Sequence, residues 1–198
     1  GAGTALPPVA RRPRYRPMRL RAAALFLATS FAVSAQSPTV PLGSVVEAGF
    51  VDLRWQPRRL HELAPAPAIV VYFATLDCPL VQRYLPRLGR LARDYEPQGV
   101  PFVIANVGTR DPFVDAVAQV AAAAPAALFA KDDALELMRA CGVDRTGAAV
   151  VLDADRRLVY RGRIDDQHGF AGARPEPRRN DLQAALDQVL AGGEVEVP

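Results

Sequence analysis

Cys78 and Cys141 are the only cysteines in the chain, and Cys78 has the surroundings expected of a reactive thiol. It follows an apolar, β-branched run and directly precedes Pro79 and an amphipathic segment. A cysteine at a helix N-terminus lies near free backbone N–H groups and the positive end of the helix dipole, which stabilise the thiolate. The thiolate can attack a peroxide or a disulfide. The adjacent Asp77 opposes this stabilisation, so an inert, half-buried cysteine is the alternative interpretation.

Strand and helix patterns alternate around this junction. The apolar run at 68–75 predicts a strand buried on both faces, and apolar residues at three- and four-residue spacing predict a helix over Pro79–Tyr95. Further predicted elements are a strand pair within 44–63, strands at 99–108 and 127–130, helices at 111–124, 132–142 and 179–193, and two strands over 148–164. Predicted helix starts are Asp111 followed by Pro112, Asp132, and Asn180 or Asp181; predicted ends are Gly142 and Gly192. Parallel strands need helical crossovers, so this order predicts an α/β fold with a mixed central sheet.

The first 35 residues predict export. From Met18 the chain has two arginines, an apolar stretch at 22–31 and small residues before Gln36, the pattern of a secretory signal peptide. An uncleaved anchor or a buried helix is the alternative. We therefore expect an upstream tail at 1–17 that is not the native start, a signal peptide at 18–35, a linker at 36–44 and a folded domain at 45–198. The expected location is the periplasm or the cell exterior, without membrane attachment after signal removal.

The charge distribution argues against nucleic-acid binding. The chain has 24 basic and 21 acidic residues, but six arginines lie in the first 35 residues, which contain no acid. The remainder therefore has 18 basic and 21 acidic residues, a net charge of −3. A folded part with this balance lacks the basic excess that attracts a phosphate backbone.

The strand–Cys-Pro–helix junction and the element order resemble the thioredoxin fold, a three-layer α/β/α sandwich with a mixed central sheet. More narrowly, "FATLDCPLVQRYLPRLGRLARDY", "GVPFVIANVG", "VVLDADRRLVYRGRIDDQ" and "RNDLQAALDQVLAGG" resemble the redoxin group, which is related to alkyl hydroperoxide reductase and thiol-specific antioxidant proteins. The resemblance covers residues 45–197. It implies thiol-based redox activity that requires neither an organic cofactor nor a metal.

The family's site residues are matched unevenly. Cys78 matches the attacking cysteine of thioredoxins and the peroxidatic cysteine of peroxiredoxins. Thr75 matches the threonine three residues earlier in the peroxiredoxin motif, whose hydroxyl could bond a thiolate or a peroxide oxygen; a β-branched strand residue is the alternative. Val81 replaces the second thioredoxin cysteine, and Val71 replaces the proline of the peroxiredoxin motif. Gly147 stands where thioredoxins have a cis-proline and peroxiredoxins an arginine.

Two further residues are candidates through this resemblance. Arg145 lies two residues before Gly147 and is the candidate to support the thiolate in place of the missing arginine. Cys141 is the candidate resolving thiol through a disulfide with Cys78, which requires Cα atoms within about 7 Å. A buried core cysteine is the alternative, and an external thiol is the other resolving route.

The remaining polar residues favour other roles. Copper-chaperone relatives of this fold use a Cys-x-x-x-Cys pair and a distant histidine, but Gln82 occupies the second position here. Cys78 with His168 is too small a ligand set, so we predict no metal site. Asp165 and Asp166 point to opposite faces of a strand. We therefore expect ion pairs or the rim of a partner site there, and no acid–base pair.

These observations predict an exported thiol-dependent redox protein in which Cys78 attacks a peroxide or a protein disulfide and an external thiol supplies electrons. A binding or accessory module that keeps the fold without catalysis is the alternative, since the family's second cysteine, proline and arginine are missing. A metal-handling accessory protein is the third interpretation.

Overall fold

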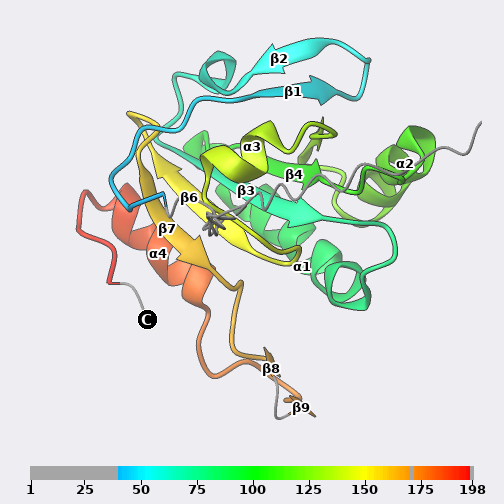
Figure 1. Ribbon diagram of the computed structural model, residues 1–198. Coiled ribbons are helices and arrows are strands. Elements are labelled where there is room, and N and C mark those ends of the chain that lie inside the picture. The colour runs from blue at the N-terminus through cyan, green and yellow to red at the C-terminus, as the bar shows by residue number, and fades with distance from the viewer. Residues whose placement is uncertain (1–39, 170–171, 197–198) are drawn as a thin grey trace, which may run out of the picture. The chain divides into compact units, whose positions relative to one another are not determined.

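The computed structural model describes residues 40–169 and 172–196. Seven strands form one mixed sheet in the order β2-β1-β5-β4-β3-β6-β7, and β8 pairs with β9 separately (Figure 1). The elements are β1 (Gly49–Asp52), β2 (Pro57–Arg59), η1 (Leu60–Leu63), β3 (Ala68–Ala74), α1 (Pro79–Tyr95), η2 (Glu96–Gln98), β4 (Phe102–Asn106), α2 (Phe113–Ala123), β5 (Leu128–Lys131), α3 (Glu136–Ala140), β6 (Ala149–Asp153), β7 (Leu158–Gly162), β8 (His168–Gly169), β9 (Gly172–Ala173) and α4 (Asp181–Leu190).

Strand β3 lies inside the sheet because every one of its residues, AIVVYFA, is apolar enough to be buried. It is parallel to β4 and antiparallel to β6. The parallel pair is joined by α1, as crossover connections require, and β6 enters from the later hairpin. Ala74 pairs with Asn106 in the β3–β4 register, so both strands end at the same sheet edge. The mixed sheet predicted from the element order is confirmed.

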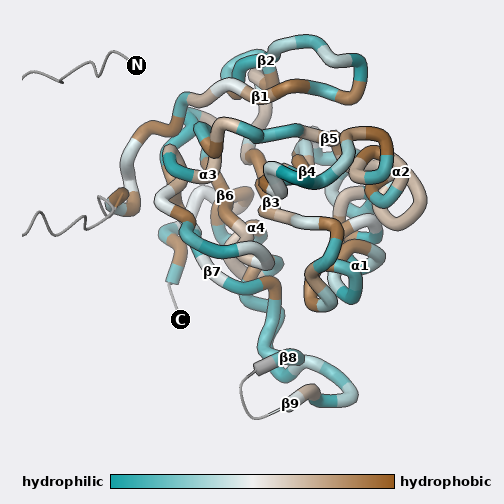
Figure 2. The backbone as a smooth tube through the Cα atoms, turned by 45° about the vertical axis from the view of Figure 1, so that its right-hand side comes forward, coloured by the Kyte–Doolittle hydropathy of each residue, from teal (hydrophilic) through white to brown (hydrophobic). Residues whose placement is uncertain are grey.

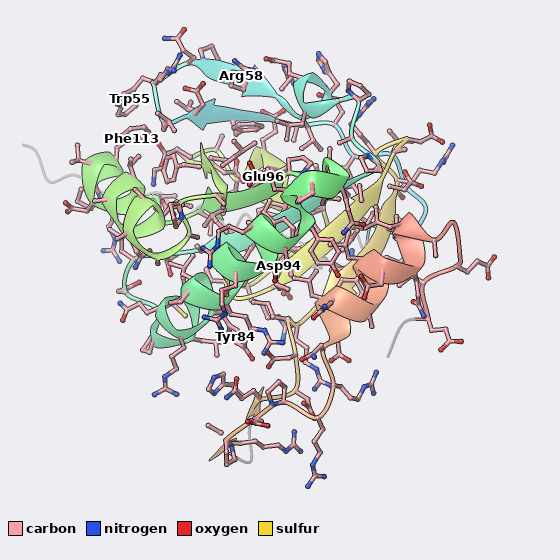
Figure 3. The ribbon with its side chains drawn as sticks, turned by 180° about the vertical axis from the view of Figure 1, so that it is seen from behind. Trp55, Arg58, Tyr84, Asp94, Glu96 and Phe113 are labelled. Carbon is pink, nitrogen blue, oxygen red and sulfur yellow. The ribbon has the colours of Figure 1, made fainter. Side chains whose placement is uncertain are left out.

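Helices cover both faces of the sheet. Val70 and Tyr72 of β3 belong to a hydrophobic cluster with residues of α1, α2 and α4, which we call the α1 face. Val71 and Phe73 belong to a second cluster with residues of α3, which we call the α3 face. Figure 3 shows α1, α2 and α4 in front of the sheet, and Figure 1 shows α3 on the other side. The predicted three-layer α/β/α sandwich is confirmed.

Helix α1 has the bounds predicted from its apolar spacing, Pro79–Tyr95. Its buried side chains face the sheet, as expected of an amphipathic helix. Gly89 allows α1 to approach α2 closely, because a Cβ atom there would lie 2.7 Å from the carbonyl oxygen of Ala123 and from the Cα of Ala124. The helix that follows Cys78 therefore packs against both the sheet and α2.

The predicted start of the helix at 111–124 was wrong. Helix α2 begins at Phe113 with Pro112 at its N-cap, and Asp111 makes no capping bond. The Asp111 carboxylate instead accepts a hydrogen bond from the backbone N–H of Leu76, 2.8 Å away. Local sequence predicted an acceptor at this position correctly but could not identify a donor from another part of the chain.

The predicted start of the helix at 132–142 was also wrong. Helix α3 begins at Glu136, after Leu135, which adopts a left-handed backbone conformation with φ 54°. The Asp132 carboxylate still serves this helix, because it accepts hydrogen bonds from the N–H groups of Leu137 (3.3 Å) and Met138 (2.9 Å). Gly142, at φ 63°, follows the helix end, as predicted.

The short hairpin β8–β9 was not predicted. It projects from the sheet in both Figure 1 and Figure 2, and its strands contain two residues each. The chain then returns to α4, whose N-cap is Asn180, one of the two predicted starts. Strands this short leave no apolar alternation in the sequence, so the pattern gives no signal for them.

The predicted tail at 1–17 and signal peptide at 18–35 lie outside the described residues. Across residues 40–169 and 172–196, no helix has the length and apolar character needed to cross a membrane. Part of the segment predicted as a linker is attached to the fold. The N–H of Gly43 donates to the carbonyl of Leu158 (2.7 Å), and the N–H of Leu158 donates to the carbonyl of Ser44 (2.9 Å).

Candidate active site

Cys78 occupies the N-cap of α1, at the sheet edge where β3 and β4 end. Pro79 is the first helical residue, and the first helical hydrogen bond runs from the N–H of Gln82 to the carbonyl of Cys78 (3.1 Å). The Cys78 side chain is half-buried, carries a free thiol and makes no capping hydrogen bond. A sulfur in this position is reachable from solvent and lies at the positive end of the helix dipole.

The loop between β3 and Cys78 is held by three side chains that bond to the backbone of Leu76. The N–H of Leu76 donates to Asp111, while its carbonyl accepts from the Nε2 groups of Gln82 (2.9 Å) and Gln119 (3.4 Å). Both backbone polar groups of Leu76 are therefore satisfied. Two residues before the cysteine, the backbone is tied to α1, to α2 and to the segment before α2.

A buried polar network supports Asp111 from behind. Its Oδ2 also accepts from the Nδ2 of Asn106 (2.8 Å), and the Nζ of Lys131 donates to the Oδ1 of Asn106 and the carbonyl of Gly108, both at 2.6 Å. Lys131, at the end of β5, is the only lysine in the chain and is 4% exposed. A buried amine needs such partners, and Asp133 supplies a carboxylate 3.1 Å away.

The loop before β6 forms the opposite wall of the site. The N–H of Gly147 donates to the carbonyl of Phe73 (2.8 Å), and the N–H of Phe73 donates to the carbonyl of Ala148 (3.1 Å). Gly147 adopts φ +83°, and a Cβ atom there would lie 3.2 Å from the Cδ2 of Leu80 and 3.9 Å from the hydroxyl of Tyr72. This glycine therefore faces the first turn of α1 and the end of β3.

Tyr72 brings a hydroxyl group to this wall. Its side chain is fully buried on the α1 face, and its oxygen has no hydrogen-bond partner among the described residues. Burial is the main reason that the pKa of its phenol is raised; the negative charges that Cys78 and Tyr84 would carry raise it further. Sequence reasoning missed Tyr72, although it is the only polar-tipped side chain in the apolar run at 68–74.

The other predicted site residues make no hydrogen bond to Cys78 within residues 40–169 and 172–196. Thr75 directly follows β3, and no hydrogen bond of its hydroxyl is formed within the described part of the chain. Arg145 is 77% exposed, and its Nε pairs with Asp144 at 2.9 Å. Val81, where thioredoxins have their second cysteine, is fully buried in the α1-face cluster.

Cys141 lies on the other side of the sheet from Cys78. It is fully buried in the α3-face cluster, whereas Cys78 packs against the α1-face cluster. Both cysteines are free. Burial, together with the nearby Asp132, raises the pKa of the Cys141 thiol to about 12. This placement fits the alternative of a buried core cysteine.

A second polar cluster joins α1 to the segment after β7. Asp165 is fully buried; its Oδ1 accepts from the hydroxyl of Tyr84 (2.5 Å) and its Oδ2 lies 2.6 Å from the Nη1 of Arg87. Figure 3 places Tyr84 at the end of α1 nearest the β8–β9 hairpin, where the Tyr84 and His168 rings meet edge to face at 5.2 Å. The neighbouring Asp166 pairs with Arg174 at 2.8 Å. Both carboxylates form ion pairs, as predicted. The predicted strand at Asp165 and Asp166 was wrong, because β7 ends at Gly162.

Metal-ligating side chains do not gather at this edge. Gln82, at the copper-chaperone ligand position, uses its amide on the Leu76 carbonyl. Within residues 40–169 and 172–196, the histidine, cysteine, aspartate and glutamate side chains form no group of three or more able to hold an ion. The arrangement around Cys78 is instead that of a single thiol at a helix N-terminus, flanked by an unpartnered phenol.

Two proteins of known structure resemble this chain over most of its length. A crystal structure of a hypothetical protein from Sinorhizobium meliloti 1021 is 30% identical, with a TM-score of 0.68, and the match covers 81% of this chain and 90% of that one. An uncharacterized conserved protein from Geobacillus kaustophilus is 28% identical at the same TM-score, over 79% and 85% of the two chains. No curated protein matches the sequence.

Redox proteins of this fold are among the structural neighbours. A protein from Chlorobium tepidum described as thiol:disulfide interchange protein DsbE is 16% identical with a TM-score of 0.59, over 77% of this chain and 97% of that one. The chain is therefore a thioredoxin-fold protein. Residues 44–176 match the Redoxin family model, and the chain belongs to the redoxin family.

Proposed function

We propose that this redoxin is an exported single-cysteine oxidoreductase in which Cys78 attacks a peroxide or a protein disulfide. The observation that carries this proposal is the position of Cys78, half-buried at the N-cap of α1, while Cys141 is fully buried behind the sheet. The predicted signal peptide at 18–35 supports export.

The proposed chemistry needs one thiolate and an outside electron donor. With a peroxide, the Cys78 sulfur forms a bond to one oxygen, the O–O bond breaks, and the second oxygen leaves as hydroxide that the solvent protonates. The sulfur becomes a sulfenic acid. An external thiolate then attacks this sulfur, the S–O bond breaks, hydroxide leaves and takes a proton from the solvent, and a mixed disulfide forms. A second external thiol attacks the donor's sulfur in this mixed disulfide, releases Cys78 as a thiol, and leaves the two donor sulfurs joined as a disulfide.

A protein disulfide would enter the same cycle one step later. Cys78 attacks one sulfur, the other sulfur leaves as a thiolate, and the mixed disulfide is released by an external thiol. Val81 removes the internal route that a second cysteine would provide in thioredoxins. The cycle therefore depends on the external thiol at every turnover.

Activity assays on the purified protein and on Cys78→Ser test this proposal. With glutathione or dithiothreitol as donor, we expect the wild-type protein to consume hydrogen peroxide or reduce a disulfide substrate, and the variant to do neither. Cys141→Ser is the matched control and should retain the activity, because the buried thiol has no role in the cycle. Equal rates for the wild-type protein and Cys78→Ser would favour the alternative of a binding or accessory module.

A further inference from the structure

One buried polar group on the α1 face makes no hydrogen bond that would explain its place in the fold. The Tyr72 hydroxyl is shielded from water and has no hydrogen-bond partner in the described part of the chain. Buried hydroxyls in proteins are almost always hydrogen-bonded, because losing the bonds made to water is unfavourable. A phenylalanine would fill the same apolar space without this loss.

The position of this hydroxyl links it to the site. Tyr72 is on the α1 face of β3, and its oxygen lies 3.9 Å from the point where Gly147 would carry a Cβ atom. The Cδ2 of Leu80, two residues after Cys78, is 3.2 Å from the same point. The Cys78 side chain packs against the same α1-face cluster that contains Tyr72, and a negative charge on Cys78 would raise the pKa of Tyr72 further. The unpartnered hydroxyl therefore lies near the loop before β6, on the face of the sheet that Cys78 contacts.

We propose that the Tyr72 hydroxyl donates a hydrogen bond to the Cys78 thiolate and so increases the fraction of Cys78 able to attack. This inference rests on the proposed function of Cys78. It assigns Tyr72 a direct role at the reacting sulfur, in a protein that lacks the cis-proline, the second cysteine and the arginine of its relatives.

The strength of the proposed hydrogen bond depends on the charge state of the sulfur. A thiol sulfur is a weak acceptor, whereas an ionised acceptor forms a hydrogen bond about twice as strong as a neutral one. The proposed bond is therefore weak to a thiol and becomes strong when Cys78 ionises. Because burial raises the pKa of Tyr72, its phenol keeps its proton and remains a donor across the working pH range.

Other charged groups near the site do not compete for this role. Those on the surrounding segments are Asp77 beside Cys78, Asp111 before α2, Tyr84 on α1 and Arg145 on the loop before β6. Asp77 is exposed, Arg145 is paired with Asp144, and the Tyr84 hydroxyl donates to Asp165. All of them are unchanged in a Tyr72→Phe variant, so a change in Cys78 ionisation can be attributed to the missing hydroxyl.

The test compares Tyr72→Phe with the wild-type protein and with Tyr160→Phe. Tyr160 is also fully buried, but its hydroxyl donates to the carbonyl of Arg163 at 2.6 Å, away from Cys78. The rate of Cys78 alkylation by iodoacetamide is measured from pH 5 to 10 with mass-spectrometric identification of the site. Losing a hydrogen bond to a charged group should raise the midpoint of this profile by about 1–2 pH units in Tyr72→Phe.

The expected combination is a higher midpoint in Tyr72→Phe, an unchanged midpoint in Tyr160→Phe, and a Tyr72→Phe protein at least as stable as wild type. Rates of peroxide consumption and disulfide reduction at neutral pH should fall in Tyr72→Phe by the factor by which the alkylation profile shows the thiolate fraction to fall. An unchanged profile in Tyr72→Phe, with wild-type Cys78 active, overturns this inference alone. A wild-type Cys78 without redox activity overturns the proposed function itself.

Discussion

Replacing Asp165 with alanine should destabilise the protein severely, because this carboxylate is the centre of a buried polar cluster. It is fully buried, and it receives the Tyr84 hydroxyl at 2.5 Å and the N–H of Gln167 at 2.8 Å. Arg87 lies 2.6 Å away and is 18% exposed. The alanine variant leaves two hydrogen-bond donors and one cation without an acceptor.

The magnitude follows from what remains behind. Removing one partner of a buried ion pair costs about 3–5 kcal/mol, because the other charge stays buried and unpaired. The partial exposure of Arg87 moves the expected loss toward the lower end, about 3 kcal/mol, since water can reach part of the guanidinium. Tyr84 is only 5% exposed. Its hydroxyl contributes to this loss, because no other acceptor replaces the Asp165 carboxylate.

Urea unfolding followed by circular dichroism measures this loss. With a urea dependence of about 1–3 kcal/mol per molar, a loss of 3 kcal/mol lowers the unfolding midpoint by about 1–3 M. Adding Arg87→Ala to Asp165→Ala should recover part of the loss, because the unpaired charge is removed. Asp166→Ala is the neighbouring control and should have the smaller effect, since its Arg174 partner is 46% exposed. A loss below about 1 kcal/mol in Asp165→Ala would refute the buried cluster.

Three further predictions concern the site and its surroundings. Cys141 should resist iodoacetamide in the native protein at pH 8, because burial raises its pKa to about 12, and should react in urea; native labelling of both cysteines would contradict its placement. Asp111→Ala should lower stability by about 1–2 kcal/mol and slow Cys78 alkylation, because the N–H of Leu76 loses its acceptor, whereas Asp111→Asn keeps an acceptor oxygen and should stay near wild type in both assays. Backbone N–H groups, Arg179 first, hold the pKa of Asp166 below its usual value, so its contribution to stability is present at pH 7 and is lost as the pH falls through the folded-state pKa. Thermal melts should therefore show that Asp166→Asn is less stable than wild type at pH 7 and that the difference narrows toward pH 2; a constant difference would contradict this.

The sequence was sufficient for the layers of the fold and for the placement of Cys78. The apolar run of β3 indicates a strand that is buried on both faces of the sheet. The three- and four-residue spacing of apolar residues in α1 indicates a helix that is buried along one side. The strand–cysteine–proline–helix order then fixes Cys78 at the sheet edge. These features depend on neighbours within a few residues, which the pattern contains.

The hydrogen-bond partners of several polar residues could not be predicted from the sequence, because they come from distant parts of the chain. Asp111 and Asp132 both have the residue type of a helix N-cap, yet one accepts a bond from the loop before Cys78 and the other from a helix that begins four residues later. Tyr72 looks like one more buried strand residue until its hydroxyl is found without a partner. Lys131, the only lysine in the sequence, is likewise buried in a polar network with Asn106, a partner 25 residues away that no local pattern indicates.

The rate at which Cys78 is oxidised tests most directly whether Cys78 is a redox-active thiol. The purified protein is exposed to hydrogen peroxide, and separately to oxidised glutathione, at pH 7 for seconds to minutes. Free thiols and sulfenic acid are then trapped, and both cysteines are mapped by mass spectrometry. We expect selective oxidation of Cys78 to a sulfenic acid or a mixed disulfide, faster than that of free cysteine, with Cys141 still reduced. Oxidation of Cys78 no faster than that of free cysteine under both conditions would contradict it.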